Sequence, residues 1–324
     1  MDTRNLEQFA AAIPHRADRR QFLKTACSLA GGLAMSRLAG QTLANIQGSA
    51  PRQGKLPHIP FGPHSVSRLI AGGNPPAGGS HQTKLMDMHY REYFTFEQTV
   101  EFLHRCQAQN INTWQSSYSK RVRDVLTRFR NEGGTMHWIC LCPPEQVADE
   151  KQLAEVLALK PIGVAFHGEV TDVMWRQGKI DTAKETLRRI REAGVCVGLS
   201  THNPAVVEYV EEKGWDIDFY MTCVYRKSRS YEELVELMGE PPIGEVYLRS
   251  DVPKMCDVIR KAGKTCLAFK ILAAGRTCDN PEQVGNAFQY VFTHVKPGDG
   301  VIVGMYPRFT DQIKENADLT RQYG

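Results

Sequence analysis

Short apolar runs alternate with amphipathic segments from residue 66 to the C-terminus. The apolar runs are uninterrupted, which is typical of strands that are covered on both faces. The segments between them carry apolar residues at helical spacing, and several end at a glycine. Strands are predicted at 66–73, 111–117, 136–142, 162–168, 195–200, 217–225, 264–272 and 300–306, and helices at 95–109, 121–133, 149–159, 181–194, 204–214, 252–263, 281–295 and 310–324.

Eight strand–helix units in succession predict a closed (β/α)8 barrel of the TIM type, in the α/β class and in a single domain. The length of 324 residues fits one such barrel with additions. An open doubly wound sheet is the alternative, but no G-x-G-x-x-G motif follows the first strand. The stretch 226–251 forms a long excursion after the sixth strand, so we regard it as a candidate lid.

The N-terminal segment carries the features of an export signal. Residues 18–24, DRRQFLK, resemble the twin-arginine signal, and the apolar stretch 25–35 follows them. That stretch is too short for a stable membrane span, which needs roughly 20 residues, and a signal-peptidase site is expected after Ala44. We assign 1–50 to a signal peptide and linker and 51–324 to the barrel. The alternative is an amphipathic N-terminal helix.

The signal predicts where the protein works. We expect the twin-arginine export machinery to carry the folded chain to the periplasm or another extracytoplasmic space. Twin-arginine substrates fold in the cytoplasm before they cross the membrane, often with a cofactor already bound. The chain has nine cysteines, eight of them after the signal and most inside apolar runs. This placement predicts buried free thiols, not a disulfide framework.

The amino-acid composition and net charge indicate which classes of binding partner to expect. Hydrophobic residues make up 42% of the chain, enough for a substantial core. Forty Lys and Arg against 36 Asp and Glu give a net charge of +4, spread without blocks. We therefore expect no nucleic-acid partner, and a small molecule is the expected substrate.

Polar and titratable residues gather where the predicted strands end. In a (β/α)8 barrel the chemistry takes place at the C-terminal ends of the strands. A barrel that served only as a scaffold would not need such a set there. The strand ends carry Asn74, Gln115, Ser116, Ser117, Tyr118, Cys142, His167, Glu169, Thr201, His202, Asn203, Tyr225, Arg226, Lys270, Tyr306 and Arg308.

Four segments of the chain resemble the aldo-keto reductase superfamily. They are AFHGEVTD (165–172), the stretch 181–210 that contains VCVGLSTHNP, KILAAGR (270–276) and VIVGMYPRFTDQIKEN (301–316). The resemblance spans about residues 60–324. It implies an oxidoreductase that uses NADP to reduce or oxidise a small carbonyl or sugar-like substrate.

The resemblance also implies catalytic residues. His167 stands where the family has the histidine that helps to polarise the carbonyl. Tyr118 lies near the place of the general-acid tyrosine, about two residues early. Gln115 stands where the family has an aspartate, and the third strand ends without the family's lysine.

The implied cofactor residues come from four strand ends. Ser200 and Thr201 match the turn that binds the nicotinamide amide, with Thr201 in place of an asparagine. Tyr225 is the aromatic residue under the nicotinamide. The loop after the seventh strand supplies Lys270, Leu272 and Gly275, whose backbone can approach a pyrophosphate closely. Arg308 would hold the 2′-phosphate of NADP, and Glu315 and Asn316 match adenine contacts.

Two other functions remain open on the same scaffold. A lyase or isomerase that acts on a carbohydrate-like substrate would use His167, Glu169, His202 and Lys270, with or without a divalent metal. Lys270 would then act as a base or as a Schiff-base nucleophile if it faces inward. The third alternative is an inactive barrel that binds a ligand or a partner protein.

Overall fold

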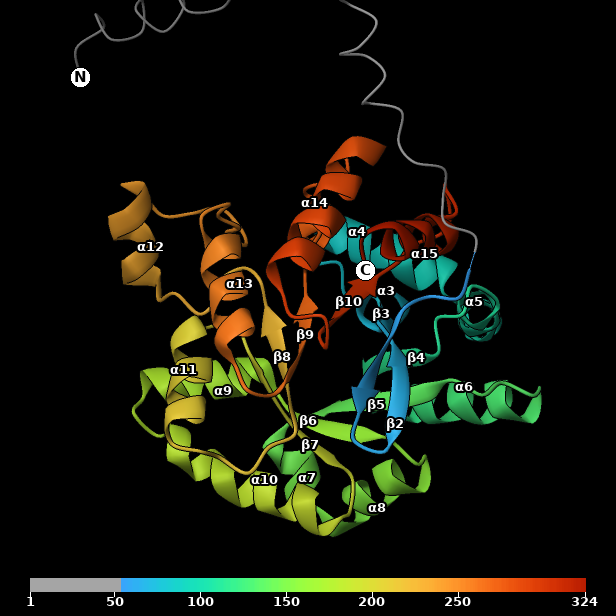
Figure 1. Cartoon of the computed structure of the whole chain (residues 1–324), viewed down its shortest axis with the longest axis horizontal. Coiled ribbons are helices and arrows are strands. Elements are labelled where there is room, and N and C mark those ends of the chain that lie inside the picture. The colour runs from blue at the N-terminus through green and yellow to red at the C-terminus, as the bar shows by residue number, and fades with distance from the viewer. Residues whose placement is uncertain (1–53) are drawn as a thin grey trace, which may run out of the picture. The chain divides into compact units, whose positions relative to one another are not determined.

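The computed structural model describes residues 54–324, so the predicted export signal lies outside the described residues. Eight parallel strands close into a barrel in the order β10-β3-β4-β5-β6-β7-β8-β9, and helices surround it (Figure 1). The prediction of a single-domain (β/α)8 barrel is confirmed, and the alternative of an open sheet is wrong. The strands are β3 (Leu69–Gly72), β4 (Thr113–Ser117), β5 (His137–Cys142), β6 (Gly163–Phe166), β7 (Cys196–Thr201), β8 (Phe219–Cys223), β9 (Thr265–Phe269) and β10 (Gly300–Gly304).

Each predicted helix is present within a few residues of its expected bounds. Side-chain caps explain several starts, because Thr95, Ser119 and Asn280 each accept a hydrogen bond from a backbone N–H of the first turn. These helices are α5 (Phe96–Ala108), α6 (Lys120–Asn131), α8 (Glu150–Ala158), α10 (Ala183–Glu192), α11 (Pro204–Glu212), α13 (Asp251–Lys261), α14 (Pro281–His294) and α15 (Gln312–Tyr323).

Several short elements were not predicted. Strands β1 (His58–Phe61) and β2 (His64–Ser67) form an antiparallel hairpin ahead of the barrel, so the predicted strand 66–73 is the end of β2 followed by β3. The additional helical elements are α3 (Asn74–Ala77), α4 (Lys84–Tyr93), α7 (Pro144–Ala148), α9 (Gly168–Arg176), η1 (Ile180–Thr182), α12 (Tyr231–Met238) and η2 (Ala273–Gly275). Figure 1 shows α12 standing apart from the helices around the barrel, and none of its residues is buried.

The hairpin closes the amino-terminal end of the barrel. Ile59, Phe61 and Val66 belong to one buried cluster with the inward-facing residues of the strands. The Phe61 ring lies 4.7 Å from the Phe219 ring, measured between centroids. The first residue of β6, Gly163, lies so close to both rings that a Cβ there would be 3.0–3.2 Å from them. The barrel is therefore filled at this end and open for chemistry only at the other.

The eight cysteines of the described residues are free, and six of them are buried. This confirms the expectation of buried thiols for the part of the chain that the structure describes. Among residues 54–324, no helix combines the length and apolar character needed to cross a bilayer.

Replacing Phe61 by Ala tests the role of the hairpin. Phe61 is 2% exposed, so the substitution leaves a cavity at the closed end, and we expect the free energy of unfolding to fall by about 3–5 kcal/mol. Urea unfolding followed by circular dichroism measures the change. Phe309→Ala is the control, because Phe309 is 80% exposed and its loss should cost less than about 1 kcal/mol. Equal free energies of unfolding of the two variants would contradict the idea that packing of the hairpin stabilises the barrel.

Candidate functional site

His167 lies on the inner face of the barrel, just past the end of β6. Ala165 belongs to the inner cluster, whereas Val164 and Phe166 belong to the outer cluster beneath the helices. His167 continues the inner series and is the N-cap residue of α9. Its Nδ1 is buried and has no hydrogen-bond partner in the described residues. Burial lowers the pKa of His167, and the nearby Glu169 carboxylate partly opposes that effect. Burial thus favours the neutral imidazole, but His167 is not among the residues that line the two cavities described below.

Tyr118 lies on the other face of the barrel wall. Its side chain belongs to the outer cluster together with Trp114, and its hydroxyl donates a hydrogen bond to Glu155 on α8. Burial and this hydrogen bond raise the pKa of Tyr118. The structure therefore does not bring Tyr118 to His167, contrary to our expectation. The reason is the alternation of side chains along β4, which gives residue 118 the same outward direction as residue 114.

A first cavity of about 470 Å³ opens at the carboxyl ends of β3, β9 and β10. It extends from Gly72 and Gln115 at the barrel axis, past the loop after β9, to the N-terminal turns of α14 and α15. Five of the nine predicted cofactor residues line it, namely Lys270, Leu272, Gly275, Glu315 and Asn316. Lys270, Leu272 and Gly275 follow β9, whereas Glu315 and Asn316 lie in α15. The fold therefore brings these two segments of the predicted cofactor site together.

The other four predicted cofactor residues do not line this cavity. Ser200 and Thr201 are buried at the end of β7, where the Thr201 hydroxyl donates to Asp172 Oδ1 at 2.7 Å. Tyr225 is buried against Tyr247, with ring centroids 5.1 Å apart. Arg308 points elsewhere and donates to Glu92 on α4 at 3.2 Å. Thr201, Tyr225 and Arg308 are thus already engaged with neighbours, and Ser200 is buried.

Lys270 is the cation at the inner end of the first cavity. It follows β9 in a left-handed conformation with φ of 61°, which turns the side chain out of the strand's alternation. Its Nζ lies 5.6 Å from the centroid of the Phe269 ring and has no hydrogen bond or ion pair within residues 54–324. Burial lowers the pKa of Lys270, and Cys223 and Glu245 partly oppose that effect. The lysine is thus free to meet an anion or an electrophile.

A second cavity of about 400 Å³ lies beside the first, and His81 lines both. Its polar lining includes Glu169, His202 and Arg226, together with Ser228. The Nε of Arg226 and the Oγ of Ser228 are buried without a hydrogen-bond partner in the part of the chain that the structure describes. Such orphaned buried donors are costly unless a ligand or water satisfies them.

Asp172 of α9 holds His202 at the wall of this second cavity. The Nδ1 atom of His202 lies 2.7 Å from Asp172 Oδ2, and the His202 backbone N–H donates to the same carboxylate at 3.2 Å. The imidazole packs edge-on to the Phe269 ring, with centroids 5.3 Å apart. His202 is therefore held in position by a carboxylate and an aromatic ring.

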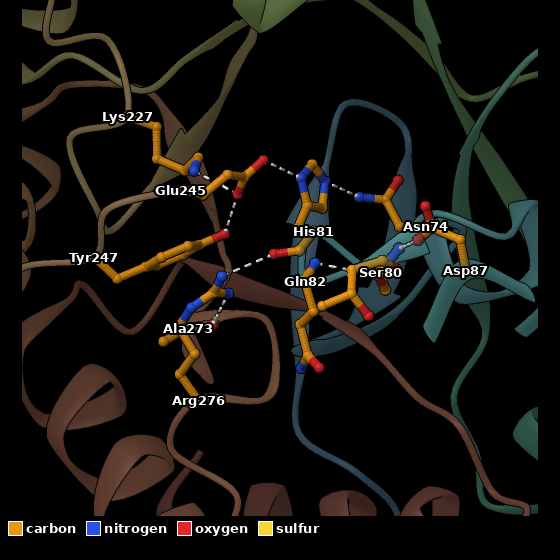
Figure 2. A network of polar contacts seen from close by, with 11 residues as sticks. Asn74, Ser80, His81, Gln82, Asp87, Lys227, Glu245, Tyr247, Ala273 and Arg276 are labelled. Carbon is orange, nitrogen blue, oxygen red and sulfur yellow. Dashed lines mark hydrogen bonds and ion pairs between the residues drawn. The ribbon is translucent and has the colours of Figure 1, made fainter. Parts of the chain in front are cut away.

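The loops after β3, β8 and β9 meet at a junction beside the two cavities (Figure 2). Glu245 accepts hydrogen bonds from His81 Nδ1 at 2.9 Å, from Lys227 Nζ at 2.5 Å and from the Tyr247 hydroxyl at 2.8 Å. His81 Nε2 in turn accepts from Asn74 Nδ2 at 3.0 Å. The loop after β3 is thereby joined to the excursion after β8, across the mouth of the barrel.

The residues at the mouth do not form a metal site. Within residues 54–324, no group of three or more His, Cys, Asp or Glu side chains is placed to hold a metal ion. The alternative in which His167, Glu169 and His202 bind a divalent metal has no support from this geometry.

Three residues of the mouth were not singled out in the sequence. Asp172 lies in α9, which was not predicted, one helical turn past His167. His81 and Glu245 come from loops on opposite sides of the barrel, so their pairing depends on the closed fold. The motif AFHGEVTD contained Asp172, but only the observed helix places it beneath His202.

The comparisons with known proteins agree with the architecture. No family model matches the sequence, and no curated protein matches it. A structure of an aldo-keto reductase from Klebsiella pneumoniae in complex with NADPH has a TM-score of 0.50 at 13% identity, and the match covers 82% of this chain and 90% of that one. A glycerol dehydrogenase from Gluconobacter oxydans has a TM-score of 0.49 at 11% identity, with coverage of 82% and 90%. A truncated 3-deoxy-D-arabino-heptulosonate 7-phosphate synthase from Thermotoga maritima has 0.48 at 14%, with 83% and 90%. The likeness to the Klebsiella pneumoniae structure, at 13% identity, shows the barrel fold alone.

Glu245→Gln tests the three-loop junction. Burial alone would raise the pKa of Glu245, but hydrogen bonds from His81, Lys227 and Tyr247 outweigh it and hold that pKa well below its ordinary value. The junction therefore stabilises the mouth above the ordinary carboxyl range, about pH 4.3, and loses that effect as the pH falls through the lowered pKa. At about pH 7 we expect limited proteolysis within residues 226–250 to accelerate about fivefold to tenfold in the variant.

Glu240→Gln is the matched control, because Glu240 is exposed in the same excursion. Its cleavage rate should equal that of the wild type. The wild type should keep its protection down to about pH 5, where the Glu245 carboxylate is still charged. Equal cleavage of the Glu245→Gln variant and the wild type would contradict a role for the junction in holding the excursion.

Proposed function

We propose that the protein is a nicotinamide-dependent oxidoreductase that interconverts a carbonyl and an alcohol in a small, sugar-like substrate. The observation that carries the proposal is the first cavity, in which Lys270, Leu272 and Gly275 meet Glu315 and Asn316. We also propose that the chain is exported folded by the twin-arginine route, a hypothesis that depends on residues 18–24 alone.

The donor set of the first cavity suits a dinucleotide. Its volume of about 470 Å³ lies in the range of small-molecule and cofactor sites. Lys270 has an unpaired ammonium that suits a phosphate group, and Asn316 is a buried amide that suits the edge of a base. Arg308, by contrast, is paired with Glu92 outside the cavity. The resemblance favours NADP, and Lys270 is then the cation in the cavity that would meet its phosphates.

We propose that the nicotinamide end of the cofactor lies at the inner end of the first cavity, beside the second cavity. When bound, a nicotinamide supplies or accepts a hydride at the substrate carbon. Gln115 lines the inner end, whereas His167 is not among the residues that line either cavity. The Gln115 amide offers hydrogen bonds to a bound ligand. The proposal gives Tyr118 no part in the reaction, because its hydroxyl is bonded to Glu155 on the outer face.

Calorimetry with NADPH and with NADH on the folded protein tests the proposal. We expect binding well below millimolar concentration, and we expect Lys270→Gln to weaken it about tenfold to a hundredfold through loss of a charge-assisted contact. Lys314→Gln is the control, because Lys314 is an exposed residue of α15 that pairs with Asp318. No binding of either dinucleotide at millimolar concentration would overturn the proposal.

Lys270 favours one second candidate, a lyase or aldolase-type enzyme that forms an imine with a carbohydrate-like carbonyl compound. A lysine becomes nucleophilic when burial lowers its pKa, and Lys270 has such a shifted pKa at a cavity wall without an ion-pair partner. Lys227 lies nearby, but its Nζ is paired with Glu245 at 2.5 Å. The two lysines therefore differ in whether a carboxylate engages the amino group.

Borohydride trapping with DL-glyceraldehyde separates this candidate from the first. If Lys270 forms an imine, reduction should leave a stable adduct on the peptide that contains Lys270, and mass spectrometry should find it in near-stoichiometric yield. The adduct should be absent from Lys270→Gln and should persist in Lys227→Gln. Labelling spread evenly over exposed lysines would count against the lyase candidate.

A further inference from the structure

The second cavity contains a carboxylate–imidazole pair to which no role has been assigned. Asp172 is 3% exposed and His202 is 8% exposed. Asp172 accepts from the His202 ring at 2.7 Å and from the Thr201 hydroxyl at 2.7 Å, so both carboxylate oxygens are engaged. With Nδ1 donating to Asp172, the Nε2 atom of the neutral ring is an acceptor, and it has no partner within residues 54–324.

We propose that His202, held by Asp172, is the proton-transferring residue for carbonyl–alcohol chemistry on a polyhydroxylated substrate bound in the second cavity. The inference rests on the proposed oxidoreductase function. It assigns to His202 the proton transfer that the sequence resemblance had assigned to Tyr118.

The chemistry balances with one proton and one hydride. In reduction, a bound reduced nicotinamide would supply a hydride to the carbonyl carbon, and the His202 imidazolium would give its Nε2 proton to the carbonyl oxygen. The ring would then be neutral and would regain a proton from solvent. In oxidation, Nε2 would accept the hydroxyl proton, and an oxidised nicotinamide would take the hydride from the carbon. Asp172 stabilises the imidazolium in both directions, as a positioning residue that does not itself exchange a proton.

The lining of the second cavity points to a hydroxyl-rich, uncharged ligand. Its charged side chains balance, with three cations and three anions besides the two histidines: Arg176, Arg226, Lys227, Glu169, Asp172 and Glu245. Arg226 and Ser228 supply hydrogen-bond donors to the wall of the cavity, which suits a ligand with several hydroxyl oxygens. The carboxylate of Glu169 offers an acceptor to the same ligand.

Two contacts place the pair beside the proposed cofactor cavity. Phe269 lines the first cavity, and its ring touches His202. His81 lines both cavities from the loop after β3. Gly168 leaves room for the His202 imidazole, because a Cβ at residue 168 would lie 3.3 Å from His202 Cε1 and 2.8 Å from Ser200 Oγ.

The chain offers an internal control for the pair. His104 Nε2 lies 2.9 Å from Glu132 Oε2, on helices outside the barrel and away from both cavities. This is also an imidazole–carboxylate contact, but it faces no cavity. Substitutions at His104 remove a histidine of similar bonding without touching the proposed site.

The first arm of the test uses no cofactor. Diethyl pyrocarbonate modifies unprotonated imidazole nitrogens, and peptide mapping locates the adducts. We expect wild-type protein to be modified at His202, with His104 as a positive control for the reagent. Modification of His104 without modification of His202 would overturn the proposal, because Nε2 would then be closed to a substrate.

The second arm measures reduction of DL-glyceraldehyde with NADPH or NADH, together with cofactor binding by calorimetry. His202→Gln should lower kcat about a hundredfold or more, and Asp172→Asn about tenfold or more. KM and the cofactor Kd should stay within about threefold of the wild type in both variants. His104→Gln should match the wild type in every parameter.

The outcomes separate the two proposals. A wild type that binds neither dinucleotide overturns the oxidoreductase function itself. A wild type that binds cofactor but does not reduce DL-glyceraldehyde overturns the polyhydroxy substrate class. An active His202→Gln variant with kcat within about threefold of the wild type overturns the role of His202 alone. If Asp172→Asn fails to fold, His202→Gln still decides the question, because the Asp172 bonds to Thr201 and to the residue 202 backbone remain.

Discussion

The closed ring of eight parallel strands imposes one constraint on every residue of its wall. A side chain points either toward the barrel axis or toward the helices, and the direction alternates at each residue. In β6 this alternation places Ala165 inside and Phe166 outside, so His167 continues the inner series. In β4 it places Trp114 and Tyr118 outside. The chemistry available at the mouth follows from this geometry before any cofactor or substrate is considered.

Buried carboxylates at both ends of the barrel connect the wall to the loops. At the mouth, Asp172 binds the Thr201 hydroxyl and the His202 backbone, and Asp251 binds the Arg226 backbone and the Arg229 guanidinium. At the closed end, Asp299 accepts from the Cys266 backbone at 2.8 Å. Each carboxylate replaces water for two donors, which makes its loop part of the rigid barrel. The loops that carry His202 and Lys227 are therefore positioned by charge as well as by packing.

The barrel could be predicted from sequence because its strands and helices are local patterns. Each uninterrupted apolar strand and each capped amphipathic helix can be recognised from a window of about a dozen residues. The hairpin β1–β2 could not be found in this way, because its strands are four residues long and include exposed polar positions. The strand-end residues Lys270 and His167 were identified as candidates, but their partners were not. Glu245 meets His81 across 164 positions of sequence, a pairing that only ring closure creates.

The direction of Tyr118 was a different kind of error. Its position after β4 was predicted. Its resemblance to the family's general-acid tyrosine, however, implied that the side chain points into the barrel mouth. Because the side-chain period is two, the parity set by Trp114 decides the matter in favour of the outer face. The Trp138 indole that donates to Ser116 Oγ at 2.9 Å on this outer face confirms the parity of the strand.

The excursion between β8 and α13 begins and ends at a single carboxylate. Asp251, at the end of the segment, accepts hydrogen bonds from the backbone of Arg226 at 3.1 Å and from the side chain of Arg229 at 2.9 Å, both near its start. The two ends of the segment are therefore joined, whereas Ile243 near its tip is fully exposed. A loop closed at its base can gain or lose residues with little effect on the wall beneath, because the entropic cost of lengthening it grows only logarithmically. Insertions, deletions and grafted sequences in this segment can thus reshape the roof over the second cavity while the barrel remains unaltered. For evolution and for protein engineering alike, it is the place where a new preference among ligands is acquired at the least risk to folding.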